Sequence, residues 1–259
     1  MPLLQLKGMT KYFGGLAAVN GVDMAVKESE ILGLIGPNGA GKTTLFNLIN
    51  GFIPPTSGEA RFKGELITGL HAHEIARRGI GRTFQQTVLF MESTVLENVF
   101  TGFHLSYRTG LLGQFLHTPA ARRESKEIMG KAMEIVEFLG LGSQKDMLAS
   151  NLPHGYQRVL GLCVALASNP ALLLLDEPVA GMNPQETENM IRLIDQLRER
   201  GMTIVVVEHD MKAVMSLCDR IVVLNYGKKI AEGRPREIRE NREVIEAYLG
   251  KEGAGTHAA

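Results

Sequence analysis

Apolar and polar positions along this chain alternate in short runs that predict strands interleaved with helices. Three runs of five residues are wholly or almost wholly apolar, and such runs are typical of strands buried on both faces of a sheet. They lie at Ile31–Ile35, 171–175 and Thr203–Val207. Patterns of helical period occupy 157–168, 183–200 and Met211–Leu217. This alternation predicts an α/β fold with a mostly parallel sheet, whose ligands bind at the carboxyl ends of the strands.

Further strand-like segments predict a second, antiparallel layer beside the parallel core. Residues 3–8 and 22–26 have the composition of strands, and a Gly-Gly pair lies between them as a turn. Residues 58–66 follow a Pro-Pro break and predict one more strand. Toward the C-terminus we expect strands at 221–224 and 229–231 and one helix at 237–249.

The stretch from residue 86 to residue 155 lacks strand signals and predicts a helical subdomain inserted into the core. Thr94 and Glu97 have the S/T-x-x-E spacing of a capping box, which predicts the start of a helix. Thr118 offers a second N-cap with Pro119 at the first helical position. Apolar residues at helical spacing follow it, as one face of a long helix requires.

The composition fits one large domain and excludes several classes of function. With 259 residues, 44% of them hydrophobic, we expect a single domain over 1–250 and a disordered tail at 251–259. Basic and acidic residues number 28 each, so no basic field draws the chain to nucleic acid or anionic lipid. Cys163 and Cys218 lie in apolar helical patterns and are expected to be buried thiols. No apolar run nears the ~20 residues that span a bilayer, which predicts a cytosolic protein that reaches a membrane through a partner.

Residues 36–44 read Gly-Pro-Asn-Gly-Ala-Gly-Lys-Thr-Thr and fit the phosphate-binding pattern G-x-x-x-x-G-K-[ST] between a strand and a helix. Its glycines let the backbone approach an anion, and the loop N–H groups with the helix N-terminus direct positive dipoles at phosphate. Lys42 would reach the β- and γ-phosphates of a nucleotide, and the Thr43 hydroxyl would ligate Mg²⁺. The residues expected to bind nucleotide here are Gly36, Asn38, Gly39, Ala40, Gly41, Lys42, Thr43 and Thr44.

Two of the apolar strands end in titratable residues. Asp176 and Glu177 follow the second run; Asp176 would hold Mg²⁺ beside the phosphate-binding loop, and Glu177 would polarise the attacking water as general base. Burying such charges without a partner is costly, although a pair of helix-capping acids is the alternative. His209 follows the third run in the same way, and its imidazole could donate to a γ-phosphate and to the water. A structural histidine is the alternative there.

The order and spacing of these motifs resemble the ATPase subunit of ABC transporters over nearly the whole chain. The matching motifs are 36–44 (Walker A), 172–177 (Walker B with its glutamate), 180–184 (D-loop) and His209 (H-loop). The resemblance implies a P-loop NTPase core with an antiparallel β subdomain and an inserted α-helical subdomain, and it implies ATP and Mg²⁺ as ligands. It also implies that Gln85 is the Q-loop residue, which serves both catalysis and the metal. Phe13, or Tyr12 as its neighbour, would stack on adenine, with ordinary core packing as the alternative.

One motif departs from the pattern of this family. The signature, usually L-S-G-G-Q, is expected just before the helix that leads to Walker B, where residues 152–158 read Leu-Pro-His-Gly-Tyr-Gln-Arg. Pro153 replaces the serine and has neither a hydroxyl nor an N–H, and Tyr156 replaces the glutamine. The resemblance implies that four residues of this signature segment face the nucleotide of a partner subunit. They are Pro153, His154, Gly155 and Tyr156. The departure leaves open a regulatory ATPase that binds ATP and hydrolyses little.

Finer segments resemble the LivG-type group, which serves branched-chain amino acid uptake. They are 82–85, 94–99, 180–184, 208–211 and 247–250. This resemblance implies the ATP-hydrolysing subunit of a bacterial or archaeal importer, peripheral on the cytoplasmic face of the inner membrane. The implied partners are a second ABC ATPase subunit of a different chain, two membrane permease subunits and, indirectly, a periplasmic substrate-binding protein, with no nucleic acid.

Two other classes share parts of this pattern. ATPases of lipid or lipopolysaccharide exporters have the same style of D-loop and stay open as the alternative. ABC proteins that act on ribosomes or DNA usually carry tandem cassettes or long coiled coils, and this chain of 259 residues at net charge zero has neither feature.

Overall fold

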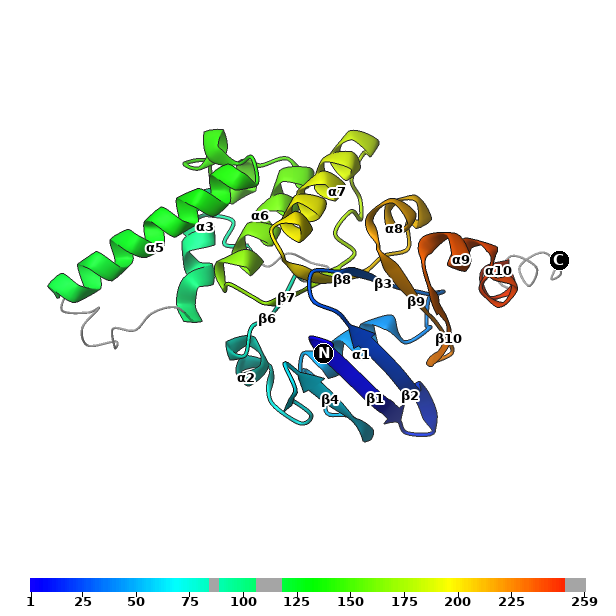
Figure 1. Cartoon of the computed structure of the whole chain (residues 1–259). Helices are drawn as coiled ribbons and strands as arrows, with labels where there is room; N and C mark the ends of the chain where they lie inside the picture. The colour runs from blue at the N-terminus through cyan, green and yellow to red at the C-terminus, as the bar shows by residue number, and fades with distance from the viewer. Residues whose placement is uncertain (84–88, 106–117, 250–259) are drawn as a thin grey trace.

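A sheet of six strands forms the centre of the molecule (Figure 1). The computed structural model of the chain describes residues 1–83, 89–105 and 118–249. In spatial order the strands are β10 (Lys228–Gly233), β9 (Arg220–Asn225), β3 (Ile31–Ile35), β8 (Thr203–Val207), β7 (Leu172–Asp176) and β6 (Ile80–Arg82). The pairs from β9 to β6 are parallel and β10 is antiparallel to β9, so the predicted mostly parallel sheet is confirmed.

A second sheet, which is antiparallel as predicted, lies beside the first (Figure 1). Its strands are β2 (Leu16–Val26), β1 (Leu4–Phe13), β4 (Ser57–Phe62) and β5 (Glu65–Leu66). The single strand predicted at 58–66 is wrong. Lys63 and Gly64 have φ values of 52° and 81°, which turn the chain into a hairpin of β4 and β5. Glycine adopts such angles at little cost, so the Lys-Gly pair was a turn signal inside the apparent strand.

The parallel sheet is buried on both faces. Successive side chains along each strand point to opposite sides, so the residues of one strand join two clusters. In β8, Ile204 and Val206 join one hydrophobic cluster, whereas Val205 and Val207 join the other. The face that carries Ile204 and Val206 is covered by three helices, α6 (His154–Ala167), α7 (Pro184–Glu199) and α8 (Met211–Leu217). The second face is covered by α1 (Lys42–Ile49) and the antiparallel sheet (Figure 1). This burial explains why the strands read as continuous apolar runs.

The segment between β6 and α6 consists, in its described residues, of helices joined by turns and by one isolated β-bridge, between Thr94 and Leu148. Its elements are α3 (Val95–Gly102), η1 (Phe103–Leu105), α5 (Pro119–Phe138), η2 (Gly142–Gln144) and η3 (Ala149–Asn151), and α2 (Ala72–Arg77) precedes β6. The capping box is confirmed, since Thr94 Oγ1 accepts from the Glu97 N–H at 3.2 Å and Glu97 Oε2 from the Thr94 N–H at 2.8 Å. The Thr118 hydroxyl likewise accepts from the Ala121 N–H at 3.3 Å, with Pro119 at the first helical position.

Two helix boundaries differ from the prediction. Helix α6 begins at His154 instead of residue 157, because Pro153 adopts the extended angles of an N-cap, φ −55° and ψ 151°. The helix predicted at 237–249 is two helices, α9 (Pro235–Glu240) and α10 (Arg242–Leu249). Asn241 separates them with a ψ of 118°, and its side chain accepts a hydrogen bond from the Val244 N–H at 3.1 Å. Asparagine competes with the helix in this way through its own short polar side chain.

The remaining expectations from composition have mixed outcomes. Cys163 and Cys218 are buried free thiols as predicted, and burial raises the pKa of Cys218 to about 12. No helix in the described part of the chain is long and apolar enough to cross a bilayer. The single domain at 1–250 and the subdomain limits at 86–155 stay predictions. The predicted tail, 251–259, lies outside the described residues.

Candidate functional site

The phosphate-binding loop follows β3 and leads directly into α1. Gly36, Gly39 and Gly41 have φ values of 151°, 80° and 101°, where side chains are strained. A Cβ on Gly36 would lie 2.1 Å from the Leu224 carbonyl oxygen, and one on Gly41 would lie 2.3 Å from that of Ala18. The loop therefore needs glycine both for its curvature and for its close contact with neighbouring backbone.

Lys42 lies over this loop at the first position of α1. It is buried, and its Nζ donates to the Gly36 carbonyl at 2.7 Å and the Pro37 carbonyl at 3.1 Å. No side chain caps the helix at Gly41, so the N–H groups of the first turn are not covered by a cap. Asn38, Gly39 and Thr43 are exposed. The loop thus presents exposed backbone and a hydroxyl beside an ammonium group, as an anion site requires.

Asp176 ends β7 and makes a buried ion pair. Its Oδ2 accepts from an Arg82 guanidinium nitrogen at 2.7 Å, and Arg82 also donates to Asn47 Oδ1 at 2.7 Å. Asn47 belongs to α1 and Arg82 to β6, so this network joins the acidic strand end to the helix of the phosphate-binding loop. The side chains of Asp176 and Arg82 are 6% and 8% exposed, so both charges depend on the pairing.

Glu177 and His209 come together at the ends of two neighbouring strands. The Glu177 N–H donates to the Val207 carbonyl at 2.9 Å, which extends the pairing of β7 and β8 by one residue. His209 Nδ1 lies 3.7 Å from Glu177 Oε1, and the ring is 59% exposed. Because β8 lies between β3 and β7, both side chains share the sheet edge with the phosphate-binding loop.

The structure adds two residues that the sequence analysis did not select. Glu208 is 2% exposed; burial raises its pKa, and backbone hydrogen bonds from Val179, His209 and Asp210 act against the rise. Burial also raises the pKa of the Tyr248 phenol in α10, and the Gly36 backbone acts against it. The position of Glu208 directly after an apolar run could have indicated a functional residue, as it does for Asp176. Only its neighbour His209 was predicted as a site residue. Tyr248 lies in segment 247–250, which resembles the LivG-type group, but nothing in the sequence indicates that α10 lies against the loop.

Other predicted site residues lie at the periphery of this edge. Phe13 and Tyr12 are 50% and 44% exposed at the end of β1, so neither ring is packed in the core. Gln85 lies outside the described residues.

The signature residues occupy the start of α6. Pro153, His154 and Tyr156 are exposed, whereas Gly155 is buried. A Cβ on Gly155 would lie 2.5 Å from Glu186 Oε1, and one on Gly181 would lie 3.4 Å from the His154 ring. Within the chain, the signature segment therefore packs against the loop before α7 and the start of α7, leaving three side chains on the surface.

A family model described as ABC transporter matches residues 19–180, which span the phosphate-binding loop, the signature segment and the acidic end of β7. The chain belongs to the ABC transporter family. A second model, described as branched-chain amino acid ATP-binding cassette transporter, matches residues 228–254.

Curated relatives of this ABC protein match along nearly the full length. The branched-chain amino acid transport ATP-binding protein BraF of Pseudomonas aeruginosa is 46% identical, and LivG of Salmonella typhimurium is 47% identical. Each match covers 96% of this chain and 98% of the relative. The lipopolysaccharide export ATP-binding protein LptB of Haemophilus influenzae is 34% identical, over 97% of this chain and 99% of its own.

Solved ABC cassettes have the same fold. An ATP-binding cassette of an ABC transporter in its ADP conformation superposes with a TM-score of 0.85 at 33% identity, covering 96% of this chain and 99% of that one. A nucleotide-free cassette gives 0.84 at 32% identity with the same coverage. The predicted fold class is confirmed, and so is the predicted enzyme class, an ATP-binding protein whose ATP hydrolysis is coupled to transport. The roles of individual residues stay predictions.

Proposed function

We propose that this chain is the ATP-hydrolysing subunit of an importer for branched-chain amino acids. The observation that carries the proposal is the 46–47% identity to BraF and LivG, against 34% to the exporter protein LptB. The match of residues 228–254 to the branched-chain model supports it independently of the nucleotide site. The exporter alternative is therefore disfavoured.

In this proposal the chain is peripheral on the cytoplasmic face of the inner membrane. It pairs with a second ABC ATPase subunit of a different chain and drives two permease subunits, to which a periplasmic protein delivers substrate. The exposed signature side chains Pro153, His154 and Tyr156 support the pairing, because a nucleotide held by the partner subunit could reach them.

The nucleotide is held by the loop and its surroundings. The N–H groups of 36–44 and the Lys42 ammonium would bind the phosphates, and Phe13 or Tyr12 would stack on adenine. Thr43 and Asp176 supply the hard oxygen donors that Mg²⁺ prefers, and Gln85 would be a further one. Because Asp176 Oδ2 pairs with Arg82, Oδ1 would take the ion or one of its waters. The metal neutralises charge that develops on the phosphate oxygens.

Hydrolysis needs a base and a donor near the γ-phosphate. Glu177 would accept a proton from the attacking water while the water oxygen bonds to the γ-phosphorus and the bond to the bridging oxygen of ADP breaks. His209 lies 3.7 Å from that carboxylate and would donate to the γ-phosphate and the water. An exposed ring at this edge can meet a phosphate that enters from solvent.

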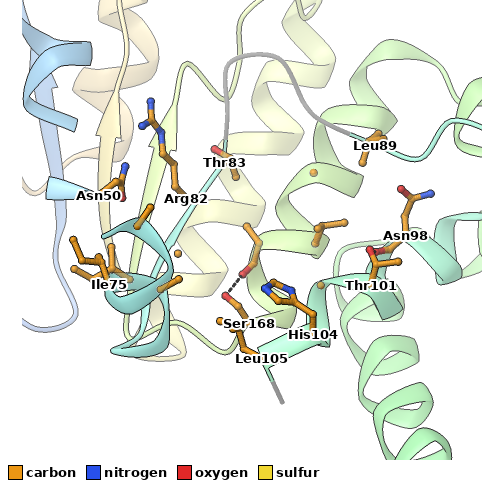
Figure 2. Close-up of a pocket in the computed structure, with 18 of the residues that line it drawn as sticks. Asn50, Ile75, Arg82, Thr83, Leu89, Asn98, Thr101, His104, Leu105 and Ser168 are labelled. Atoms are coloured by element: carbon orange, nitrogen blue, oxygen red, sulfur yellow. Dashed lines mark hydrogen bonds between the residues drawn. The ribbon is translucent and has the colours of Figure 1, made fainter. Parts of the chain in front are cut away.

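A hollow of about 540 Å³ between α2, β6, α3 and α6 is the proposed docking site of the permease (Figure 2). Ile75 of α2 and Leu105 of η1 face it from opposite sides, and Thr83 and Leu89 line it where they flank the segment that contains Gln85. Its lining is mostly apolar, and two residues of its lining, Phe52 and Phe90, are 51% and 60% exposed. Apolar hollows of this kind accept the apolar face of a short helix.

Placing a charge in this hollow should detach the permease without affecting ATP binding. Ala76 lines it from α2, so Ala76→Glu would bury an unpaired carboxylate at the interface. We expect at least about tenfold weaker association, because such a charge costs more than ~1.4 kcal/mol. The measurement is recovery of permease subunits with the tagged chain. His73→Glu, on the exposed side of α2, is the control, and equal losses from both changes would contradict the proposed docking site.

The purified chain alone should hydrolyse ATP about 100-fold more slowly than the assembled transporter, the usual cost of a missing transition-state donor. The reason is that each nucleotide site would be completed by the signature of the other subunit. A tagged chain recovered from native membranes supplies the complex, and mass spectrometry identifies its partners. A binding protein loaded with leucine should raise the rate of the reconstituted complex further.

Three outcomes separate the alternatives. High activity of the chain alone, independent of its concentration, would show a self-contained site. Recovery of lipopolysaccharide transport proteins would favour the exporter. A complete complex that binds ATP and hydrolyses little would favour the regulatory ATPase that the signature segment left open.

A further inference from the structure

The side chain of Glu208 lies between the two loops that carry Glu177 and His209. It is the first residue after β8 and is 2% exposed. A buried carboxylate is costly unless hydrogen bonds satisfy it. None of the roles proposed above for the nucleotide, the metal or the water uses this group, although the neighbouring ring of His209 has one of those roles.

Glu208 accepts hydrogen bonds from both loops at once. Its Oε1 accepts from the Val179 N–H at 3.1 Å, in the loop after β7. Its Oε2 accepts from the N–H groups of His209 at 3.0 Å and Asp210 at 3.3 Å, in the loop after β8. One carboxylate therefore joins two segments that are 29 residues apart in the sequence.

Each end of this bridge is attached to a reacting group. Val179 lies two residues after Glu177, inside a turn that the Ala180 N–H closes on the Glu177 carbonyl at 3.2 Å. Glu177 itself has a φ of 49°, an angle that only surrounding contacts maintain in a residue of this type. At the other end, the His209 ring lies 3.8 Å from Glu208 Oε2 and 3.7 Å from Glu177 Oε1.

The loop after β8 is anchored on its far side as well. Asp210 is the N-cap of α8, and its Oδ1 accepts from the Lys212 N–H at 2.8 Å and the Ala213 N–H at 3.2 Å. Glu208 and Asp210 thus hold His209 between a strand end and a helix start. Through Glu208, the loop after β7 is linked to this anchor as well.

We propose that Glu208 is a positioning residue that fixes the Glu177 carboxylate and the His209 ring relative to each other. The inference rests on the roles proposed for those two residues. Small displacements of reacting groups lower rates steeply, so losing the bridge should lower turnover more than nucleotide affinity. A purely structural role would instead lower stability and binding together.

Glu208→Gln tests the bridge because an amide has one acceptor oxygen and an NH₂ that faces N–H donors on the other side. In the assembled transporter we expect kcat to fall about 10- to 100-fold. We expect the Kd for ATP to stay within about threefold, the pattern of an interaction that acts in the transition state. Glu208→Asp keeps the charge but is one methylene too short to reach both loops, and we expect the same pattern.

Glu30→Gln is the matched control. Glu30 is also a buried carboxylate; it accepts from the Lys27 N–H at 2.5 Å and pairs with Arg220 at 2.7 Å, at the opposite end of β3 from the site. This change should lower the Tm and leave kcat unchanged. A normal kcat in both Glu208 variants would overturn the inference, as would variants that lose ATP binding or do not fold.

A double-mutant cycle with His209→Ala decides whether Glu208 acts through the ring. If it does, adding Glu208→Gln to His209→Ala should lower kcat by less than about threefold further, since no ring is left to position. If the losses in kcat of the two single variants multiply in the double variant, Glu208 does not act through the ring, and the inference is overturned. A different result would contradict the roles proposed for Glu177 and His209, namely near-normal turnover in Glu177→Gln and in His209→Ala. If those two changes stop turnover and Glu208→Gln does not, only the inference fails.

Discussion

Replacing Glu177 with glutamine should lower ATP turnover by about 100-fold or more, the typical cost of removing a general base. Binding of Mg-ATP should persist, because the amide has nearly the shape of the carboxylate and the phosphate contacts come from residues 36–44. The Val207 carbonyl that holds the Glu177 N–H in place is backbone and is unaffected by the substitution. Affinity for ATP and turnover are measured on the reconstituted transporter.

Glu134→Gln is the control for this change. It makes the same substitution on the exposed side of α5, away from the sheet edge that carries the site, and should have no effect on turnover. Near-normal turnover in Glu177→Gln would remove Glu177 from the mechanism. A large loss of ATP affinity would assign it to binding instead.

Much of the site could be predicted because its residues stand at the ends of buried strands. A strand buried on both faces appears in the sequence as an apolar run, so its end is visible without any structure. Asp176, Glu177 and His209 each follow such a run, and the parallel sheet brings the ends together. The loop at 36–44 was predictable for another reason, since glycines and a lysine at fixed spacing have few other uses.

Contacts between distant segments could not be predicted. Arg82 lies 94 residues before Asp176, and nothing in the local sequence of either residue indicates the pairing. Glu208 and Val179 meet through a backbone N–H, which carries no residue-type signal. Polar partners of this kind depend on strand order, and the order β3, β8, β7, β6 does not follow the order along the chain.

Local breaks were the other source of error. The sequence pattern runs through Lys63 and through Asn241 without losing its apparent period, yet both positions end an element. Each break rests on one backbone conformation, a positive φ in the first case and an extended ψ in the second. The period of a pattern depends on the spacing of apolar side chains and does not register the backbone angles of a single residue.

The same dependence on distant partners gives the largest expected effect on stability. Arg82→Met would remove the guanidinium from the buried Asp176 carboxylate and leave a side chain of similar length in its place. Breaking a buried pair in this way costs about 3–5 kcal/mol, because the remaining charge is left without compensation. Asn47 would lose its donor as well, since Arg82 bridges both side chains. The free energy of unfolding is measured by urea denaturation of the chain at neutral pH without nucleotide.

Arg61→Met provides the matched comparison. Arg61 pairs with Glu59 at 3.3 Å, but the two side chains are 43% and 55% exposed, so water screens the pair. Such a pair contributes about 0–1 kcal/mol. A similar, small cost for Arg82→Met would show that Asp176 does not depend on Arg82. If the pairing is the cause, the double variant Arg82→Met/Asp176→Asn should recover most of the lost stability, because it removes the uncompensated charge while turnover stays low. A double variant as unstable as Arg82→Met alone would assign the loss to packing, and the ion pair would then be incidental to the fold.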